Sequence, residues 1–113
     1  MAKTITDLRA SHCVPCRQGT PPLDARKTAA LLKGLPGWRA NDGEISKTFE
    51  FKNYYETMAF VNAIAWISHR EDHHPDLEVG YNKCKVRYSS HSVGGLSEND
   101  FICAAKIEQV LKL

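Results

Sequence analysis

The chain has 113 residues, of which 42% are hydrophobic, so it is long enough to bury one ordinary core without metal or disulfide support. Its formal net charge is only +2 and its Lys and Arg residues are spread along the sequence, which argues against a nucleic-acid surface or a polybasic membrane anchor. The N-terminus lacks the apolar core of a secretion signal, and the most apolar segment, residues 60–67, is too short to span a bilayer. We therefore expect a single domain in a cytoplasmic protein.

Residues 1–22 are expected to form a poorly ordered leader, because prolines and a glycine interrupt a stretch with little periodic hydrophobicity. The leader contains the pair Cys13 and Cys16, preceded by His12, with the C-x-x-C spacing found in redox and zinc sites. No second pair of ligands lies nearby in the sequence, so a functional pair and an incidental pair both remain open. Without a secretion signal, we expect reduced thiols.

Residues 23–113 are expected to form the folded domain. Asp24 is a suitable N-cap for a short amphipathic helix, which the Gly-Leu-Pro-Gly segment at 34–37 would end. The Asn-Asp-Gly sequence at 41–43 then predicts a tight hairpin turn. Residues 44–51 follow it with apolar side chains on one face at period two, which indicates a strand in an antiparallel pair.

The longest helix is expected to begin after Asn53, a second suitable N-cap, because apolar residues then recur at spacings of three and four. Pro75 limits this helix, since a residue that precedes proline disfavours the helical backbone conformation. His74 should therefore be extended. His73 should lie at the helix C-terminus, where the helix dipole favours a protonated imidazole.

Two further strands are expected at residues 76–81 and 83–90, and the second alternates apolar and polar side chains as a strand with one wet face does. The segment from Ser97 to Asp100 resembles a capping box and opens a final helix. The order helix, two strands, helix, two strands, helix predicts an α+β fold. In this fold a four-stranded antiparallel sheet carries three helices on one face.

Most of the side chains able to do chemistry at neutral pH lie between His69 and Asp100, and several are histidines, which can donate or accept a proton at that pH. His69 and His73 have a spacing seen in metal sites on helices, but a zincin motif requires glutamate where Arg70 stands. A Ser–His–Asp hydrolase is poorly supported, because the G-x-S-x-G elbow is missing. The pattern favours acid–base chemistry by histidines, without a metal.

The segment His69-x-x-x-His73-His74-Pro75, followed at fixed spacings by Tyr81, His91 and Asp100, resembles the signature of the pterin-4a-carbinolamine dehydratases. The blocks at 72–75, 81–83, 90–91 and 95–100 are similar to family blocks as well. The resemblance runs from the second helix to the C-terminus. The leader with its C-x-x-C pair is similar to the leader of some bacterial members.

The resemblance implies a hydro-lyase that removes water from 4a-hydroxytetrahydropterin and yields the quinonoid dihydropterin. This reaction would need no cofactor, because imidazoles can deliver one proton and remove the other. By resemblance, the catalytic set is His73, His74 and His91. The pterin-binding set adds Asp72, Ser89, Ser90 and Ser92 to these histidines. We expect His73 and His91 to transfer protons and His74 to hold and polarise the pterin.

Three more positions are candidates for a supporting role. Asp100 could orient a histidine, although its place in the first turn of a helix fits a capping role equally well. Tyr81 could flank the flat pterin ring, although a tyrosine at a strand end is more often structural. His69 occupies a signature position where the family also accepts carboxylates and lysine, which argues against a specific proton-transfer role.

The resemblance also implies a homodimer or homotetramer, and a functional link to an aromatic amino acid hydroxylase that would supply the pterin substrate. One alternative is a non-catalytic dimerisation or regulatory module with the same fold. Another is a metal-binding protein that would use the histidines together with Cys13 and Cys16.

Overall fold

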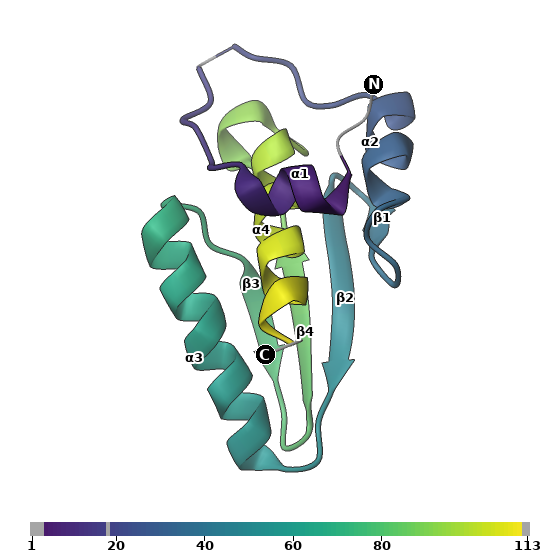
Figure 1. Cartoon of the computed structure of the whole chain (residues 1–113). Helices are drawn as coiled ribbons and strands as arrows, with labels where there is room; N and C mark the ends of the chain where they lie inside the picture. The colour runs from purple at the N-terminus through teal and green to yellow at the C-terminus, as the bar shows by residue number, and fades with distance from the viewer. Residues whose placement is uncertain (1–3, 18, 112–113) are drawn as a thin grey trace.

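The computed structural model of the chain describes residues 4–17 and 19–111. Its elements in chain order are α1 (Ile5–Ala10), α2 (Ala25–Leu32), β1 (Arg39–Asn41), β2 (Glu44–Glu50), α3 (Tyr54–Glu71), β3 (Asp76–Val79), β4 (Lys83–Tyr88), the 3-10 helix η1 (His91–Val93) and α4 (Glu98–Val110). The four strands form one antiparallel sheet in the order β1-β2-β4-β3, and α3 and α4 cover one of its faces (Figure 1). The predicted α+β class is therefore confirmed.

The turn between β1 and β2 shows why the sequence predicts this hairpin. Asp42 and Gly43 have positive φ angles of 52° and 77°, as both central residues of a type I′ turn require. The turn also sets the register of the two strands, in which Asn41 lies opposite Glu44.

One face of β4 contributes directly to the core. Cys84, Val86 and Tyr88 are fully buried, whereas Arg87 and the other alternate residues are not. Ser90, two residues beyond Tyr88, is buried on the same side. The predicted alternation is confirmed, and it leads from the core into the segment that carries His91.

Helix α4 is buried on more than one side. Every residue from Phe101 to Ala105 is buried, a run that a helix resting on the sheet by one stripe would not give. Helix α1 covers a further side of α4: the two helices pack together, α1 crosses α4, and Leu8 of α1 is fully buried (Figure 1). The leader therefore contributes to the core of the molecule.

Helix α1 is not among the three predicted helices, and it replaces part of the expected leader of low order. Its six residues are too few for a helical period to be recognised, and a helix of this length is stabilised mainly by tertiary packing. A capping box between Thr4 and Asp7 closes its N-terminus. Local sequence pattern is therefore insufficient to find this helix.

Helix α3 begins and ends where its flanking residues predict. The Asn53 side chain caps its N-terminus by accepting a hydrogen bond from a first-turn N–H. At its C-terminus Asp72 adopts the left-handed conformation, with φ of 51°, and the N–H groups of Asp72 and His73 both donate to the Ser68 carbonyl. The helix thus ends at Glu71, and His73 lies just beyond its last turn.

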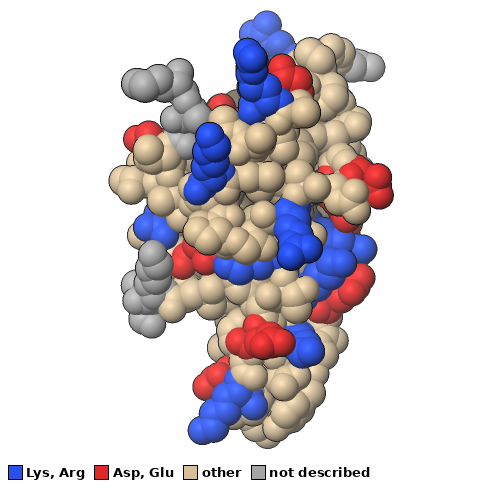
Figure 2. All heavy atoms as spheres, turned by 90° about the vertical axis from the view of Figure 1, so that its right-hand side faces the viewer, with Lys and Arg blue, Asp and Glu red and all other residues tan. Residues whose placement is uncertain are grey.

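The surface carries charges of both signs. On the face shown in Figure 2, Lys and Arg side chains are interspersed with Asp and Glu side chains, in keeping with the formal net charge of +2. None of the helices in the described part of the chain has both the length and the apolar character needed to cross a bilayer.

Candidate active site

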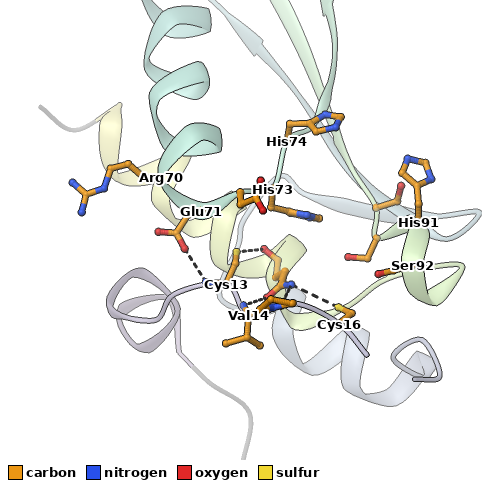
Figure 3. Close-up of a pocket in the computed structure, with 14 residues that line it drawn as sticks. Cys13, Val14, Cys16, Arg70, Glu71, His73, His74, His91 and Ser92 are labelled. Atoms are coloured by element: carbon orange, nitrogen blue, oxygen red, sulfur yellow. Dashed lines mark hydrogen bonds between the residues drawn. The ribbon is translucent and has the colours of Figure 1, made fainter. Parts of the chain in front are cut away.

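A pocket of about 550 Å³ lies where the end of α3, the end of β4 and the start of α4 meet (Figure 3). It is lined by Asp72, His73 and His74 after α3, by Ser89, Ser90, His91 and Ser92 after β4, by Cys13, Val14, Pro15 and Cys16 of the leader, and by Arg70, Glu71 and Asn99. All the residues that the sequence predicts to bind the substrate line this one pocket.

Strand pairing explains why two distant histidine segments meet. Strand β3 begins just after His73 and His74, and β4 runs antiparallel to β3, so that Asp76 lies opposite Arg87. The end of β4 therefore returns to the beginning of β3. This return brings His91, in η1, to the pocket that His73 and His74 line.

The buried Asp100 side chain holds His73 in place. His73 Nε2 lies 2.6 Å from Oδ1 of Asp100, whose side chain is fully buried. The other carboxylate oxygen, Oδ2, accepts hydrogen bonds from the Ser97 N–H and the Ser90 hydroxyl, each at 2.9 Å. Asp100 therefore caps α4 and orients a histidine at the same time, which combines the two roles that the sequence leaves open.

The ring of His73 is also fixed by stacking. It lies on the phenol ring of Tyr88, with 5.6 Å between the ring centroids and 15° between the planes. Burial raises the pKa of Tyr88 well above its ordinary value, so the phenol stays neutral. Because Nε2 donates to the carboxylate of Asp100, Nδ1 is the ring nitrogen of His73 that can take up a proton.

His74 and His91 have a different environment from His73. Both are exposed at the edge of the pocket, and Figure 3 shows their rings on the same upper side of it. His74 Nδ1 lies 3.2 Å from the carbonyl oxygen of Pro75, to which it can donate. The pocket thus combines one immobilised imidazole with two exposed ones, an arrangement that can accept a proton at one point and deliver one at another.

Two predicted supporting residues lie outside this pocket. The His69 ring packs against Trp66, with 6.0 Å between centroids, and both residues are exposed. Tyr81 lies in the turn between β3 and β4 with 66% of its surface exposed, and its carbonyl oxygen accepts a hydrogen bond from the Thr57 hydroxyl. Their places in the fold suit structural roles, whereas Asp100 contacts a pocket histidine directly.

Glu71 and Asn99 line the pocket although neither belongs to the predicted site. Glu71 Oε1 accepts a hydrogen bond from the Cys13 N–H at 2.7 Å. Asn99 Oδ1 accepts one from the Val14 N–H at 3.1 Å, and Asn99 Nδ2 donates one to the Val14 carbonyl at 2.7 Å. A signal for Glu71 was present, because it continues the buried stripe of α3 that includes Ile67.

The two leader thiols have different neighbours. Cys13 Sγ lies 3.6 Å from Cys103 Sγ, and Cys16 Sγ accepts a hydrogen bond from Asn99 Nδ2 at 3.7 Å. The hydrogen bond with Cys13 and burial raise the pKa of Cys103, so Cys103 stays protonated. Within residues 4–17 and 19–111, no group of three or more His, Cys, Asp or Glu side chains is placed to hold a metal ion.

Comparisons of the sequence with a family model and with named proteins agree with one another. The model of the family described as pterin 4 alpha carbinolamine dehydratase matches residues 21–110. A protein of Nitrosospira multiformis that carries the pterin-4-alpha-carbinolamine dehydratase name is 58% identical over 113 residues, which covers 100% of both chains. A protein of Nitrosomonas europaea with the same name is 60% identical over 109 residues, which covers 96% of each chain.

Comparison of the structure agrees with this result. The crystal structure of a transcriptional coactivator/pterin dehydratase from Brucella melitensis is 28% identical with a TM-score of 0.76, and the match covers 79% of this chain and 97% of that one. A pterin dehydratase-like protein described as a RuBisCO assembly factor in the alpha-carboxysome is 22% identical with a TM-score of 0.55, over 65% and 84% of the two chains, and shares the fold. The chain therefore belongs to the pterin-4-alpha-carbinolamine dehydratase family, a family of hydro-lyases.

Proposed function

We propose that this protein dehydrates 4a-hydroxytetrahydropterin to the quinonoid dihydropterin and water. The observation that carries the proposal is the convergence of His73, His74 and His91 on one pocket, with the buried Asp100 bonded to the first of them. In this assignment residues 23–113 form the catalytic domain, and residues 1–22 form the leader.

The reaction requires one proton to be delivered and another to be removed. The C4a–O bond breaks as the 4a-hydroxyl accepts a proton and leaves as water, N5 loses its proton, and the N5–C4a bond becomes a double bond. No electrons are exchanged with a second reactant, so general acid–base catalysis is sufficient.

We assign the removal of the N5 proton to His73 through its Nδ1 atom. The imidazolium that forms would be stabilised by the Asp100 carboxylate on Nε2, in the way that a triad aspartate stabilises its histidine. His91 is exposed, can exchange protons with water, and would deliver a proton to the leaving hydroxyl. His74 would hold and polarise the pterin.

The remaining polar groups of the pocket suit a flat ring with donors and acceptors along its edges. We assign pterin binding to Asp72, Ser89 and Ser92, which line the pocket together with the histidines. Ser90 has a different contribution, because its hydroxyl donates to Asp100 and so supports the orientation of His73.

A 4a-hydroxytetrahydropterin arises when an aromatic amino acid hydroxylase oxidises its tetrahydropterin. We therefore place this protein in tetrahydropterin recycling, with a reductase acting on its product. The expected homodimer or homotetramer and the cytoplasmic location belong to the same proposal. Sedimentation analysis of the purified protein would test the oligomer.

The alternative function is a non-catalytic dimerisation or regulatory module. The name of the Brucella melitensis relative, which joins a coactivator to a pterin dehydratase, is the observation that favours it. A module of this kind would leave the decay of the carbinolamine unchanged.

The variants His73→Ala and His91→Ala test the proposal, with His69→Ala as a matched control outside the pocket. The measurement follows absorbance while 4a-hydroxytetrahydropterin decays in chelator-treated buffer. We expect kcat/KM to fall by about two orders of magnitude in each pocket variant, the usual scale of general acid–base catalysis, and to stay near wild type in the control. Equal rates in all four folded proteins would exclude the assigned roles.

A further inference from the structure

The leader forms one wall of the candidate active site. Cys13, Val14, Pro15 and Cys16 line the pocket, and Figure 3 shows Cys13, Val14 and Cys16 below His73, on the side away from His74. These leader residues precede the part of the chain that the family model matches. The match to the family model therefore assigns no role to this wall.

Two side chains hold this wall by its backbone. Glu71 accepts a hydrogen bond from the Cys13 N–H, and Asn99 bonds to both the N–H and the carbonyl of Val14. Asn99 therefore satisfies both backbone polar groups of one leader residue, much as a neighbouring β-strand would. These contacts fix the backbone path of the leader across the pocket, and the His12 ring and Cys16 Sγ make further contacts with Glu71 and Asn99.

The Glu71 and Asn99 side chains, which together form a clamp on the leader, are nearly excluded from solvent. Asn99 is 8% exposed, and the Glu71 side chain is 4% exposed. Burial alone would raise the pKa of Glu71, but the Cys13 N–H bond, His12 at 3.1 Å and the charge of Lys106 together lower it, so Glu71 is a carboxylate. Release of the leader would leave the Glu71 carboxylate and the Asn99 amide without their hydrogen-bond partners in the leader. This loss favours the bound position of the leader.

A second attachment lies next to the clamp. Leu8 of α1 is fully buried, the Arg9 side chain donates to the Ala105 carbonyl at 3.4 Å, and Lys106 donates to the Arg9 carbonyl at 2.8 Å. The wall is therefore continuous with a helix that is docked on α4. The leader is therefore attached to the rest of the molecule at two places, through α1 and through the clamp.

We propose that Glu71 and Asn99 are positioning residues that hold leader residues 13–16 as a substrate-binding wall, which sets the affinity for the pterin without taking part in proton transfer. This inference rests on the proposed function. The wall adds Pro15 and the Cys16 thiol to a pocket whose other side carries imidazoles and hydroxyls. Such a combination suits a ring with apolar faces and polar edges.

Two single substitutions each break one of the two hydrogen bonds between Asn99 and the Val14 backbone. Asn99→Asp keeps the size of the side chain but loses the Nδ2 donor to the Val14 carbonyl and to Cys16 Sγ, and Val14→Pro removes the N–H that donates to Asn99. Asn62→Asp, at an exposed position of α3, is the matched control. We expect each clamp variant to raise KM about tenfold with kcat within about twofold of wild type, and the control to change neither.

The double variant separates a positioning role from direct contact with the substrate. If Asn99 acts through the leader, the increase in KM of the double variant is well below the product of the two single increases, because the two hydrogen bonds hold the same backbone segment and the loss of either one releases it. A double variant whose increase in KM equals the product of the two single increases, an unchanged KM in both single variants, or a fall in kcat at constant KM would overturn the proposal.

Equilibrium binding of 7,8-dihydropterin distinguishes a failure of this inference from a failure of the proposed function. Wild-type protein that does not accelerate dehydration would refute the enzyme but leave this binding measurable by calorimetry. Weaker binding by Asn99→Asp and Val14→Pro, with wild-type binding by Asn62→Asp, would support the wall. Equal binding by all four proteins, or none by any of them, would overturn it.

Discussion

His73 and His74 are adjacent in the sequence but have opposite surroundings. They lie in the short segment that joins α3 to β3. His73 contacts the buried Asp100 and the ring of Tyr88, whereas His74 is exposed. The left-handed conformation of Asp72 ends α3 just before the two histidines.

Substitution of Asp100 should impair the proton transfer that we assign to His73. Asp100→Asn keeps the size of the side chain but removes the charge that stabilises a protonated His73, so we expect kcat/KM to fall by about two orders of magnitude or more. The measurement is the carbinolamine decay assay, with circular dichroism to verify folding. Asp24→Asn, the same substitution at the N-cap of α2, is the control. A folded Asp100→Asn variant with wild-type activity would contradict the proposed role.

Helix α4 connects the site to the leader. Its first turn supplies Asn99 and Asp100, and its later residues pack against α1, so the docking of α1 and the shape of the pocket share one element. The burial of Leu8 is the main apolar contribution of α1 that the structure shows.

Leu8→Ala tests whether α1 is docked in solution. Deleting a fully buried leucine side chain costs about 2–5 kcal/mol, and we expect a loss of unfolding free energy in this range. Leu111→Ala, the same substitution at an exposed position, should cost much less. Urea denaturation of both variants measures the difference. A Leu8→Ala variant as stable as wild type would indicate the leader of low order that the sequence pattern favours.

The contribution of Glu71 should depend on pH. Its pKa in the folded protein lies below the ordinary value of 4.5, so the unfolded chain takes up the proton more readily. The stabilisation is therefore present above about pH 4.5 and is lost as pH falls through the folded pKa. We expect the stability difference between wild type and Glu71→Gln to be largest near neutral pH and to shrink below pH 4.5.

Urea denaturation at a series of pH values measures this dependence. Glu78→Gln is the control, because Glu78 is exposed and its contact with Arg87, at 3.4 Å, lies at the surface. A stability difference for Glu71→Gln that stays constant across the pH series would show that the Glu71 charge does not hold the leader.

At the scale of the whole molecule, the pocket is assembled from segments that are far apart in the sequence. The features that could be predicted depend on residues a few positions apart: the turn at 41–43, the N-cap Asn53 and the capping box that starts at Ser97. The three histidines could be grouped because the spacing of a family signature links them. The local sequence pattern and the family resemblance together therefore predict the sheet, the longer helices and the residues on one side of the pocket.

The other side of the pocket could not be predicted. The bond between Cys13 and Glu71 joins positions 58 apart in the sequence, and the bond between Val14 and Asn99 joins positions 85 apart. Both contacts depend on where α1 docks, and α1 is too short to give a periodic signal. Tertiary packing thus decides the leader wall, and local propensity does not.

The dehydratase activity itself is tested by comparing the decay of 4a-hydroxytetrahydropterin with and without the purified wild-type protein in chelator-treated buffer. We predict a faster conversion to the quinonoid dihydropterin, with a rate that increases in proportion to protein concentration. A correctly folded protein that leaves the spontaneous rate unchanged would contradict the dehydratase and favour the non-catalytic module.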